Sequence, residues 1–434
     1  MNWKRLYIIA ALLIIALDFS RLGDGFPSSI FRIDHSFHLV KFEMVKREGF
    51  GPYEEQANVP TSLFYPPMLV PLLLLAKLLQ PKMAYFLSYF LLVSFTYLTT
   101  KKLAPGKEED ALLCVLFPLS AMAFFRVGRM LEFMAHLPFI VLLFYLDRGR
   151  NTWITTGLVI LGATTHLPTA VFYSPILFFK AVEKKLYKSL FAWGAAAVAW
   201  AAAYLPKTWG MSVWKLSRAD MIYLNAKAVL EGKGLTWLVY LLAIALLGIL
   251  ASLKFLGKEA LYATPSMLFA ALLPFLYLID VPLLGYVPGW NQVILTTVIP
   301  LFSYLLLRGN EKWWKIGAAL TIAALAFPLP WVGEASRNFK YLDTVNGKYT
   351  MTAFPPDEMH RYILTQNYLA HRGVPTVLCP TWEYSDPRWY FYHPGGCDEL
   401  RHDVDYIILP ASEMWVKDCG VEYTETPDLL IVKA

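Results

Sequence analysis

Long apolar runs alternate with short polar segments along most of this 434-residue chain. Runs such as Leu235–Leu253 and Ala260–Ile279 are long enough to cross a bilayer, which takes roughly 17–25 residues. The pattern predicts about eleven crossing helices, at residues 6–20, 83–100, 110–126, 133–147, 152–165, 167–181, 189–205, 235–253, 260–279, 292–307 and 313–331. We therefore expect a polytopic α-helical membrane protein, in which the pair of segments around His166 is alternatively one broken helix.

The lysines and arginines between these segments predict the orientation of the chain. Short cytoplasmic loops are enriched in positive charge. The apolar segment Ser62–Gln80 is best left on the outer face, because counting it as a crossing would place Lys101, Lys102 and Lys107 outside. The first segment follows Lys4 and Arg5 without a small-residue cleavage site, so we expect an uncleaved span with a cytoplasmic N-terminus. The 126–132 turn, the 206–234 loop and the C-terminal region would then all face the external side.

The chain changes character near residue 335. The segment Asp357–Arg372 is predicted to be a helix, because prolines precede it and Gly373 follows it. Three short runs rich in β-branched and aliphatic residues read as strands: Thr376–Leu378, Tyr406–Leu409 and Leu429–Val432. We expect residues 1–334 to form a transmembrane domain whose first external loop spans 20–82, and residues 335–434 to form a small extracytoplasmic α/β domain.

Composition agrees with a membrane protein and excludes one common class of partner. The chain is 57% hydrophobic and only 17% charged, whereas soluble domains average about a quarter charged. The net charge of +6 is spread between the spans, so nucleic acid is not an expected partner. Three cysteines lie in the C-terminal region, and any disulfide among Cys379, Cys397 and Cys419 leaves one thiol unpaired.

The first external loop carries the most suggestive chemistry. Asp34, His35, His38 and Glu43 fall within ten residues of an otherwise apolar chain. If Ile33–Lys46 is helical, Asp34 and His38 lie one turn apart on the same face. A carboxylate and an imidazole at that spacing suit proton abstraction or metal binding. The alternative is that Asp34 caps the helix and His38 hydrogen-bonds a loop carbonyl.

Three further clusters are candidates for ligand binding on the external side. Arginines and an acid stand at a helix junction, aromatic and basic residues alternate in the 206–234 loop, and an aromatic–acidic cluster follows the Thr376–Leu378 strand. The residues at the helix junction are Arg126, Arg129 and Glu132, and the basic residue of interest in the 206–234 loop is Arg218. The aromatic–acidic cluster contains Trp382, Glu383 and Tyr384. A guanidinium is well shaped for a phosphate. The alternatives are arginines that snorkel to headgroups, an interfacial helix and an exposed loop; His166 is more typical of a structural histidine.

Together these features resemble the GT-C superfamily of membrane glycosyltransferases, and most nearly the archaeal oligosaccharyltransferase catalytic subunit and its relatives. The first-loop pattern is matched by Asp34, His38-Leu39, Gly49 and Tyr65-Pro66-Pro67. The resemblance implies that Asp34 is the first-loop catalytic or metal-associated aspartate and that Glu132 is the second-loop acid. It also implies that Arg126, Arg129 or Arg218 binds a polyprenyl phosphate.

The sequence thus predicts an enzyme that transfers a sugar from a polyprenyl-phosphate donor to an acceptor glycan, lipid or protein at the external face of the cell membrane. We expect Asp34, Glu132 and His38 to be catalytic. Substrate binding is assigned to Arg126, Arg129, Arg218, His35, Tyr65, Trp382, Glu383 and Tyr384. A divalent cation, Mg²⁺ or Mn²⁺, held by Asp34 and Glu132 is the one cofactor considered.

Two alternatives remain. The first is a strict protein oligosaccharyltransferase. The family's WWDYG motif weighs against it, because the corresponding place here reads Thr381-Trp382-Glu383-Tyr384-Ser385. The second is a transporter or a lipid-binding scaffold without chemistry. A transporter would place polar residues at the bilayer midplane and often shows paired halves, whereas the polar residues here gather in loops on one side.

Overall fold

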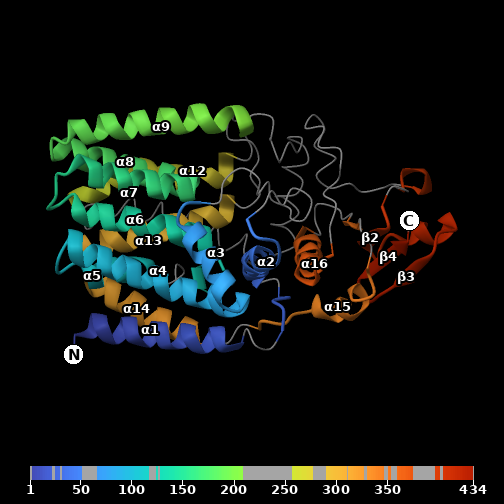
Figure 1. Cartoon of the computed structure of the whole chain (residues 1–434). Helices are drawn as coiled ribbons and strands as arrows, with labels where there is room; N and C mark the ends of the chain where they lie inside the picture. The colour runs from blue at the N-terminus through green and yellow to red at the C-terminus, as the bar shows by residue number, and fades with distance from the viewer. Residues whose placement is uncertain are drawn as a thin grey trace. The chain divides into compact units, whose positions relative to one another are not determined.

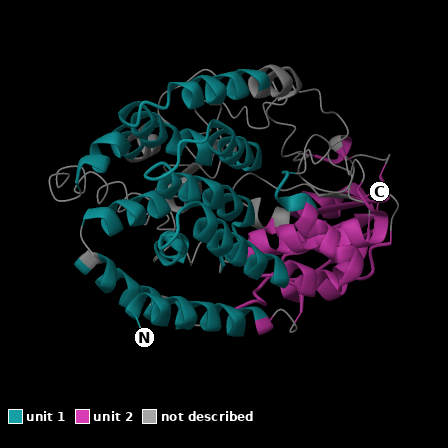
Figure 2. Cartoon of the chain, turned by 60° about the vertical axis from the view of Figure 1, so that its left-hand side comes forward, with its two compact units in different colours: residues 1–19, 66–70, 86–328 teal, residues 20–65, 71–85, 329–434 magenta. Residues whose placement is uncertain are grey.

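The protein is mostly helical and carries a small C-terminal sheet. The computed structural model describes residues 2–21, 25–29, 32–50, 66–116, 124–125, 128–208, 257–276, 290–309, 311–326, 330–346, 350–352, 359–374, 396–400 and 404–433. The chain divides into two compact units (Figure 2). Unit 1 comprises residues 1–19, 66–70 and 86–328, and unit 2 comprises residues 20–65, 71–85 and 329–434.

Unit 1 is a set of helices that lie side by side along a common direction (Figure 1). Helix α6 is at its centre, because it is buried along nearly its whole length and packs against α5, α7, α8 and α13. The described helices of this unit are α1 (Trp3–Ser20), α4 (Pro81–Leu103), α5 (Glu108–Leu116), α6 (Met130–Tyr145), α7 (Thr152–Thr165), α8 (Leu167–Glu183), α9 (Tyr187–Thr208), α12 (Lys258–Leu276), α13 (Trp290–Gly309) and α14 (Glu311–Ala326). The first residues of α4, up to Tyr85, belong to unit 2.

Helices are present at each predicted crossing that the structure describes, whereas residues 235–253 lie outside the described residues. Among the described residues, one helix, Pro81–Leu103, is both long and apolar enough to cross a membrane by length and composition. Helix α3 (Leu69–Leu78) has ten residues. It would span about 15 Å, half the thickness of a hydrocarbon core.

A cluster of two cations and two carboxylates around the buried Lys180 joins α8, α12 and α13 to the turn after α6. The Lys180 side chain, which is 1% exposed, donates to Asp147 at 3.0 Å, to Glu259 at 3.4 Å and to the Tyr304 hydroxyl at 2.7 Å. Arg308 also contacts both carboxylates, at 3.2 and 2.8 Å. Because the charges balance, burial of Lys180 does not leave an uncompensated ion.

The described residues of unit 2 form a four-stranded sheet of order β1-β2-β4-β3 (Figure 1). Its strands are β1 (Thr350–Thr352), β2 (Tyr406–Pro410), β3 (Tyr423–Glu425) and β4 (Leu429–Lys433), of which β1 and β2 are parallel and the other pairs antiparallel. Its helices are α2 (Ile33–Glu48), α3, α15 (Ser336–Leu342) and α16 (Met359–Arg372), with short 3-10 helices η7 (Cys397–Glu399) and η8 (Met414–Cys419). The predicted helix and the strands at β2 and β4 are confirmed, and Thr376–Leu378 lies outside the described residues.

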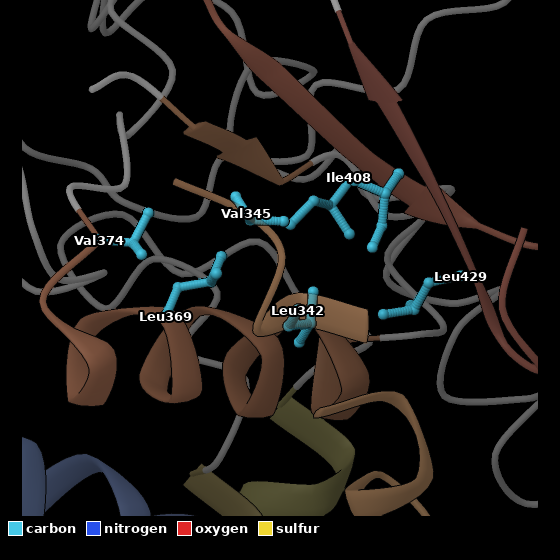
Figure 3. Packing of buried hydrophobic residues seen from close by; sticks show 7 residues of the cluster. Leu342, Val345, Leu369, Val374, Ile408 and Leu429 are labelled. Carbon is cyan, nitrogen blue, oxygen red and sulfur yellow. The ribbon is translucent and has the colours of Figure 1, made fainter. Parts of the chain in front are cut away.

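Both faces of this sheet are buried, which explains the continuous apolar runs of β2 and β4. Successive strand residues point to opposite faces. One face carries Ile408 of β2, with Leu429 and Ile431 of β4. They pack with Leu342 of α15, Leu369 of α16, and Val345 and Val374, which follow these helices (Figure 3). The other carries Ile407 and Leu409, which pack with Leu400, Val404, Val416, Leu430 and Val432. A disulfide between Cys397 and Cys419 joins η7 to η8, so the pairing that the sequence left open is resolved, and Cys379 lies outside the described residues.

Candidate functional site

The first-loop residues form helix α2, close to the predicted bounds. The helix begins at Ile33, and Arg32 occupies the N-cap position without a side-chain cap hydrogen bond. Asp34 is therefore in the first turn of the helix and not at the N-cap. The helix dipole favours a negative charge in the first turn. The reading of Asp34 as a simple capping residue does not fit this geometry.

One side of α2 packs against the start of α4 and the segment that enters the C-terminal domain. His35 is fully buried, with Nδ1 2.6 Å from the Tyr85 hydroxyl and its ring 4.7 Å from that of Trp331. The Arg32 guanidinium, also fully buried, stacks over the Trp331 ring at 4.4 Å. The backbone amides of Ser28 and Ser29 both donate to the Trp331 carbonyl. These contacts fix the chain where α2 begins.

A second side of α2 packs against α16, and Figure 1 shows the two helices side by side. The Asn367 amide donates to the Ser36 hydroxyl at 2.8 Å. Glu43 accepts from His371 at 2.7 Å. Arg47 donates to the carbonyls of Ala370 and His371, at 2.7 and 2.8 Å, and so satisfies carbonyls that the last turn of a helix leaves without intrahelical donors.

The third side of α2 carries the candidate chemistry. At 100° per residue, Asp34, His38 and Lys41 lie within about 60° of one another on the helix surface. Asp34 and Lys41 are half-buried, and His38 is 4% exposed. The Lys41 ammonium lies 4.2 Å from the centre of the Phe37 ring. A carboxylate, an imidazole and an amine therefore share one side of a helix whose other two sides are packed.

The structure brings together some of the predicted first-loop residues and separates others. Asp34 and His38 share a side, as the spacing predicted. His35 and Glu43 point elsewhere, His35 toward Tyr85 and Glu43 toward His371. Lys41 was overlooked in the sequence, although its spacing of seven residues from Asp34 marks the same side of a helix.

Among the described residues of unit 2, the pKa values of Lys41, Tyr368 and Asp428 are shifted for clear physical reasons. Burial lowers the pKa of the Lys41 amine to about 8. Burial, together with a hydrogen bond to Asp343, raises the pKa of Tyr368 to about 12. The hydrogen bond from Arg337 is the main cause that holds the pKa of Asp428 below its usual value. Of these groups, only Lys41 lies on the Asp34 side of α2.

Unit 1 holds the predicted second acid in a polar cluster among apolar helices. Arg129 pairs with Glu132 at 3.1 Å, and Glu132 is 5% exposed. His166, in extended conformation between α7 and α8, lies close enough to Glu132 and Arg129 for their charges to interact, and its Nδ1 is 2.8 Å from the Thr169 hydroxyl. One turn after Glu132, His136 is 2.9 Å from the Tyr173 hydroxyl. His166 thus has the satisfied hydrogen bond of a structural histidine and also borders the acid.

Several predicted binding residues lie outside the described residues: Tyr65, Arg126, Arg218, Trp382, Glu383 and Tyr384. Across the described ranges, no group of three or more His, Cys, Asp or Glu side chains is arranged to hold a metal ion. The Asp34 side of α2 supplies one carboxylate and one imidazole, so a divalent cation shared with Glu132 remains a prediction.

Comparison with known proteins adds no family assignment. No family model matches the chain, and neither a curated protein nor a solved structure matches it. The resemblance to GT-C glycosyltransferases consequently stays a prediction from the sequence.

Proposed function

We propose that the chain is a multi-pass membrane glycosyltransferase that moves a sugar from a polyprenyl-phosphate donor to an acceptor on the extracytoplasmic side. The observation that carries the proposal is the side of α2 on which Asp34, His38 and Lys41 are grouped. Glycosyl transfer from a phosphate needs a base for the acceptor and positive charge for the leaving group. That side of α2 supplies both kinds of group.

The proposed reaction uses the carboxylate of Asp34 as the general base. Asp34 takes the proton of an acceptor hydroxyl or amide as that oxygen or nitrogen bonds to the anomeric carbon of the sugar. The bond between the anomeric carbon and the phosphate oxygen breaks, and the polyprenyl phosphate leaves with the bonding electron pair. His38, one helical turn away, is placed to accept the proton from Asp34 afterwards.

Two features support a membrane protein whose C-terminal domain lies outside the cytoplasm. The described part of unit 1 is built of apolar helices at the predicted crossings. The C-terminal domain has a disulfide between Cys397 and Cys419, and disulfides persist mainly in oxidising compartments.

The test is transfer of a radiolabelled sugar in membranes that contain the full chain, supplied with a panel of polyprenyl-phosphate sugars. Substituting Asp34→Asn removes the base while keeping its shape, and we expect activity to fall about 100-fold or more. Glu48→Gln is the matched control, because Glu48 is an exposed carboxylate at the end of the same helix.

Full activity in Asp34→Asn would move the base elsewhere in the chain. Absence of transfer in the wild type with every donor would favour a transporter or a lipid-binding scaffold. Transfer to sequon peptides alone would favour a protein oligosaccharyltransferase.

A further inference from the structure

We infer that Lys41 is the cation that binds the phosphate group of the lipid donor, on the same side of α2 as Asp34. This inference rests on the proposed function and names the chemistry of its substrate: a phosphate monoester or diester carried on an apolar chain. The sequence had pointed to arginines for this role, and the structure gives reasons to prefer a lysine of α2.

The first reason is that Arg129, the predicted arginine that lies among the described residues, is already paired. Arg129 donates to Glu132 at 3.1 Å, so a phosphate would have to compete with a buried carboxylate for the guanidinium. Lys41 differs, since no carboxylate of the described residues lies within ion-pair distance of its ammonium. The ammonium lies over the face of the Phe37 ring, 4.2 Å from its centre. An aromatic face attracts a cation without neutralising it, which leaves the charge available to an anion.

The second reason is the position of Lys41 along the helix. Seven residues separate it from Asp34, which corresponds to about 10 Å along the axis, and His38 stands between them. The base and the leaving phosphate lie on opposite sides of the anomeric carbon during displacement. Two groups on one side of a helix, separated by the length of a sugar-phosphate unit, meet that requirement.

The third reason is that burial of Lys41 disfavours the charged form of its amine unless an anion lies nearby. Burial lowers the pKa of its amine to about 8, and no opposing carboxylate contributes to that shift. A bound phosphate would supply the counter-charge that the described residues do not provide. Two other lysines of unit 2 are differently placed, because Lys46 and Lys77 donate to each other's backbone carbonyls.

The inference is tested by binding rather than by turnover. The full chain in lipid nanodiscs is titrated with a polyprenyl monophosphate, and bound lipid is counted by native mass spectrometry. Lys41→Met should weaken binding about tenfold or more, the usual effect of losing one hydrogen bond to a charged group, and Lys41→Arg should retain most of the affinity. Lys46→Met is the matched control, an exposed lysine on the same helix, and should bind as the wild type does.

Two further arms identify what the lysine recognises. A polyprenol without phosphate should bind the wild type weakly and should not distinguish it from Lys41→Met. Competition by inorganic phosphate would show that the phosphate alone is recognised; its absence would show that the lipid-linked phosphate is required. Both results support a phosphate site at Lys41.

The inference is overturned if Lys41→Met binds as tightly as the wild type, if the wild type retains no polyprenyl phosphate, or if the polyprenol binds equally well. Its failure is distinct from that of the proposed function. Lys41-dependent binding without sugar transfer would keep the site and remove the enzyme. Sugar transfer that is unchanged in Lys41→Met would keep the enzyme and remove the site.

Discussion

Asp428 joins the sheet of unit 2 to the segment that leads into it. Its carboxylate accepts hydrogen bonds from the Arg337 guanidinium and from the Asn338 amide, the latter at 2.9 Å. The pKa of Asp428 is lowered chiefly by Arg337. A carboxyl with a lowered folded-state pKa stabilises the fold above its unfolded-state pKa, near 3.9, and this contribution is lost as the pH falls through the folded-state value.

We therefore predict that Asp428→Asn destabilises the protein at pH 7 by about 1 to 2 kcal/mol. Hydrogen bonds to a charged group contribute about 1.5 to 3 kcal/mol, and the half-exposed Arg337 side chain reduces that contribution. The difference from the wild type should shrink as the pH falls below about 4, because the wild-type carboxyl is then protonated as well. Thermal unfolding of the full chain in detergent at a series of pH values measures this. Asp418→Asn, at an exposed acid in η8, is the control, and a gap that stays constant with pH would contradict the prediction.

At the residue scale, the sequence predicted what depends on helical spacing alone. Asp34 and His38 share a side of α2 because four residues make about one turn. The directions of His35 and Glu43 depend instead on Tyr85 and on His371, which is 328 residues away from Glu43. Partners at that separation in sequence leave no local signal.

At the scale of elements, α16 determines how α2 is rotated about its axis. The bonds from Asn367, His371 and Arg47 all lie on one side of α2, roughly opposite Asp34 and His38. We expect Asn367→Leu and Arg47→Met to loosen this packing and to lower the turnover number severalfold, with little change in donor affinity. Hydrogen exchange of the α2 amides should become faster, since local opening becomes easier by about 1 kcal/mol.

Lys46→Met serves as the control for these variants, because Lys46 is exposed and contacts α3 rather than α16. Unchanged exchange in α2, or a loss of activity in Lys46→Met as large as in the α16-facing variants, would contradict a positioning role for α16.

The long helices and the five-residue strands β2 and β4 were predictable from the sequence, whereas the three-residue strands were not. Apolar runs of 15 or more residues and the boundaries of α16 follow from hydrophobicity and from helix-terminating residues. Strands β1 and β3 have three residues each, which is too short for an alternating pattern to stand out. Their pairing with β2 and β4 supplies the order that their own sequences do not specify.

At the scale of the whole molecule, the proposed orientation places the C-terminal domain and the loop after α8 on opposite sides of a membrane. Single cysteines at two exposed positions, Ser412→Cys and Lys188→Cys, test this in a background with Cys114 and Cys379 replaced by serine. We predict that a membrane-impermeant thiol reagent applied to intact cells labels Ser412→Cys and leaves Lys188→Cys unlabelled until the cells are opened.

Permeabilised cells are the control for this experiment, since both positions should then react. Labelling of Lys188→Cys in intact cells, or of neither position in opened cells, would contradict the proposed topology.

The grouping of elements into units was the feature least accessible from sequence. The sequence divided the chain near residue 335, whereas the first-loop helix and the last hundred residues form one compact unit. The apolar pattern identifies segments but does not say which distant segments pack together. The Ser36–Asn367 bond and the stack of Arg32 on Trp331 are among the contacts that unite them.

This union has a consequence for how the protein is made. Ser36 and its partner Asn367 are 331 residues apart, so at a synthesis rate of roughly 5–20 residues per second the ribosome needs about 17 to 66 seconds to produce α16 after α2. During that interval α2 is complete but lacks the helix on which it packs. Truncated chains that end before residue 359 should therefore expose α2 to proteolysis, and maturation of the first loop should wait for the end of translation.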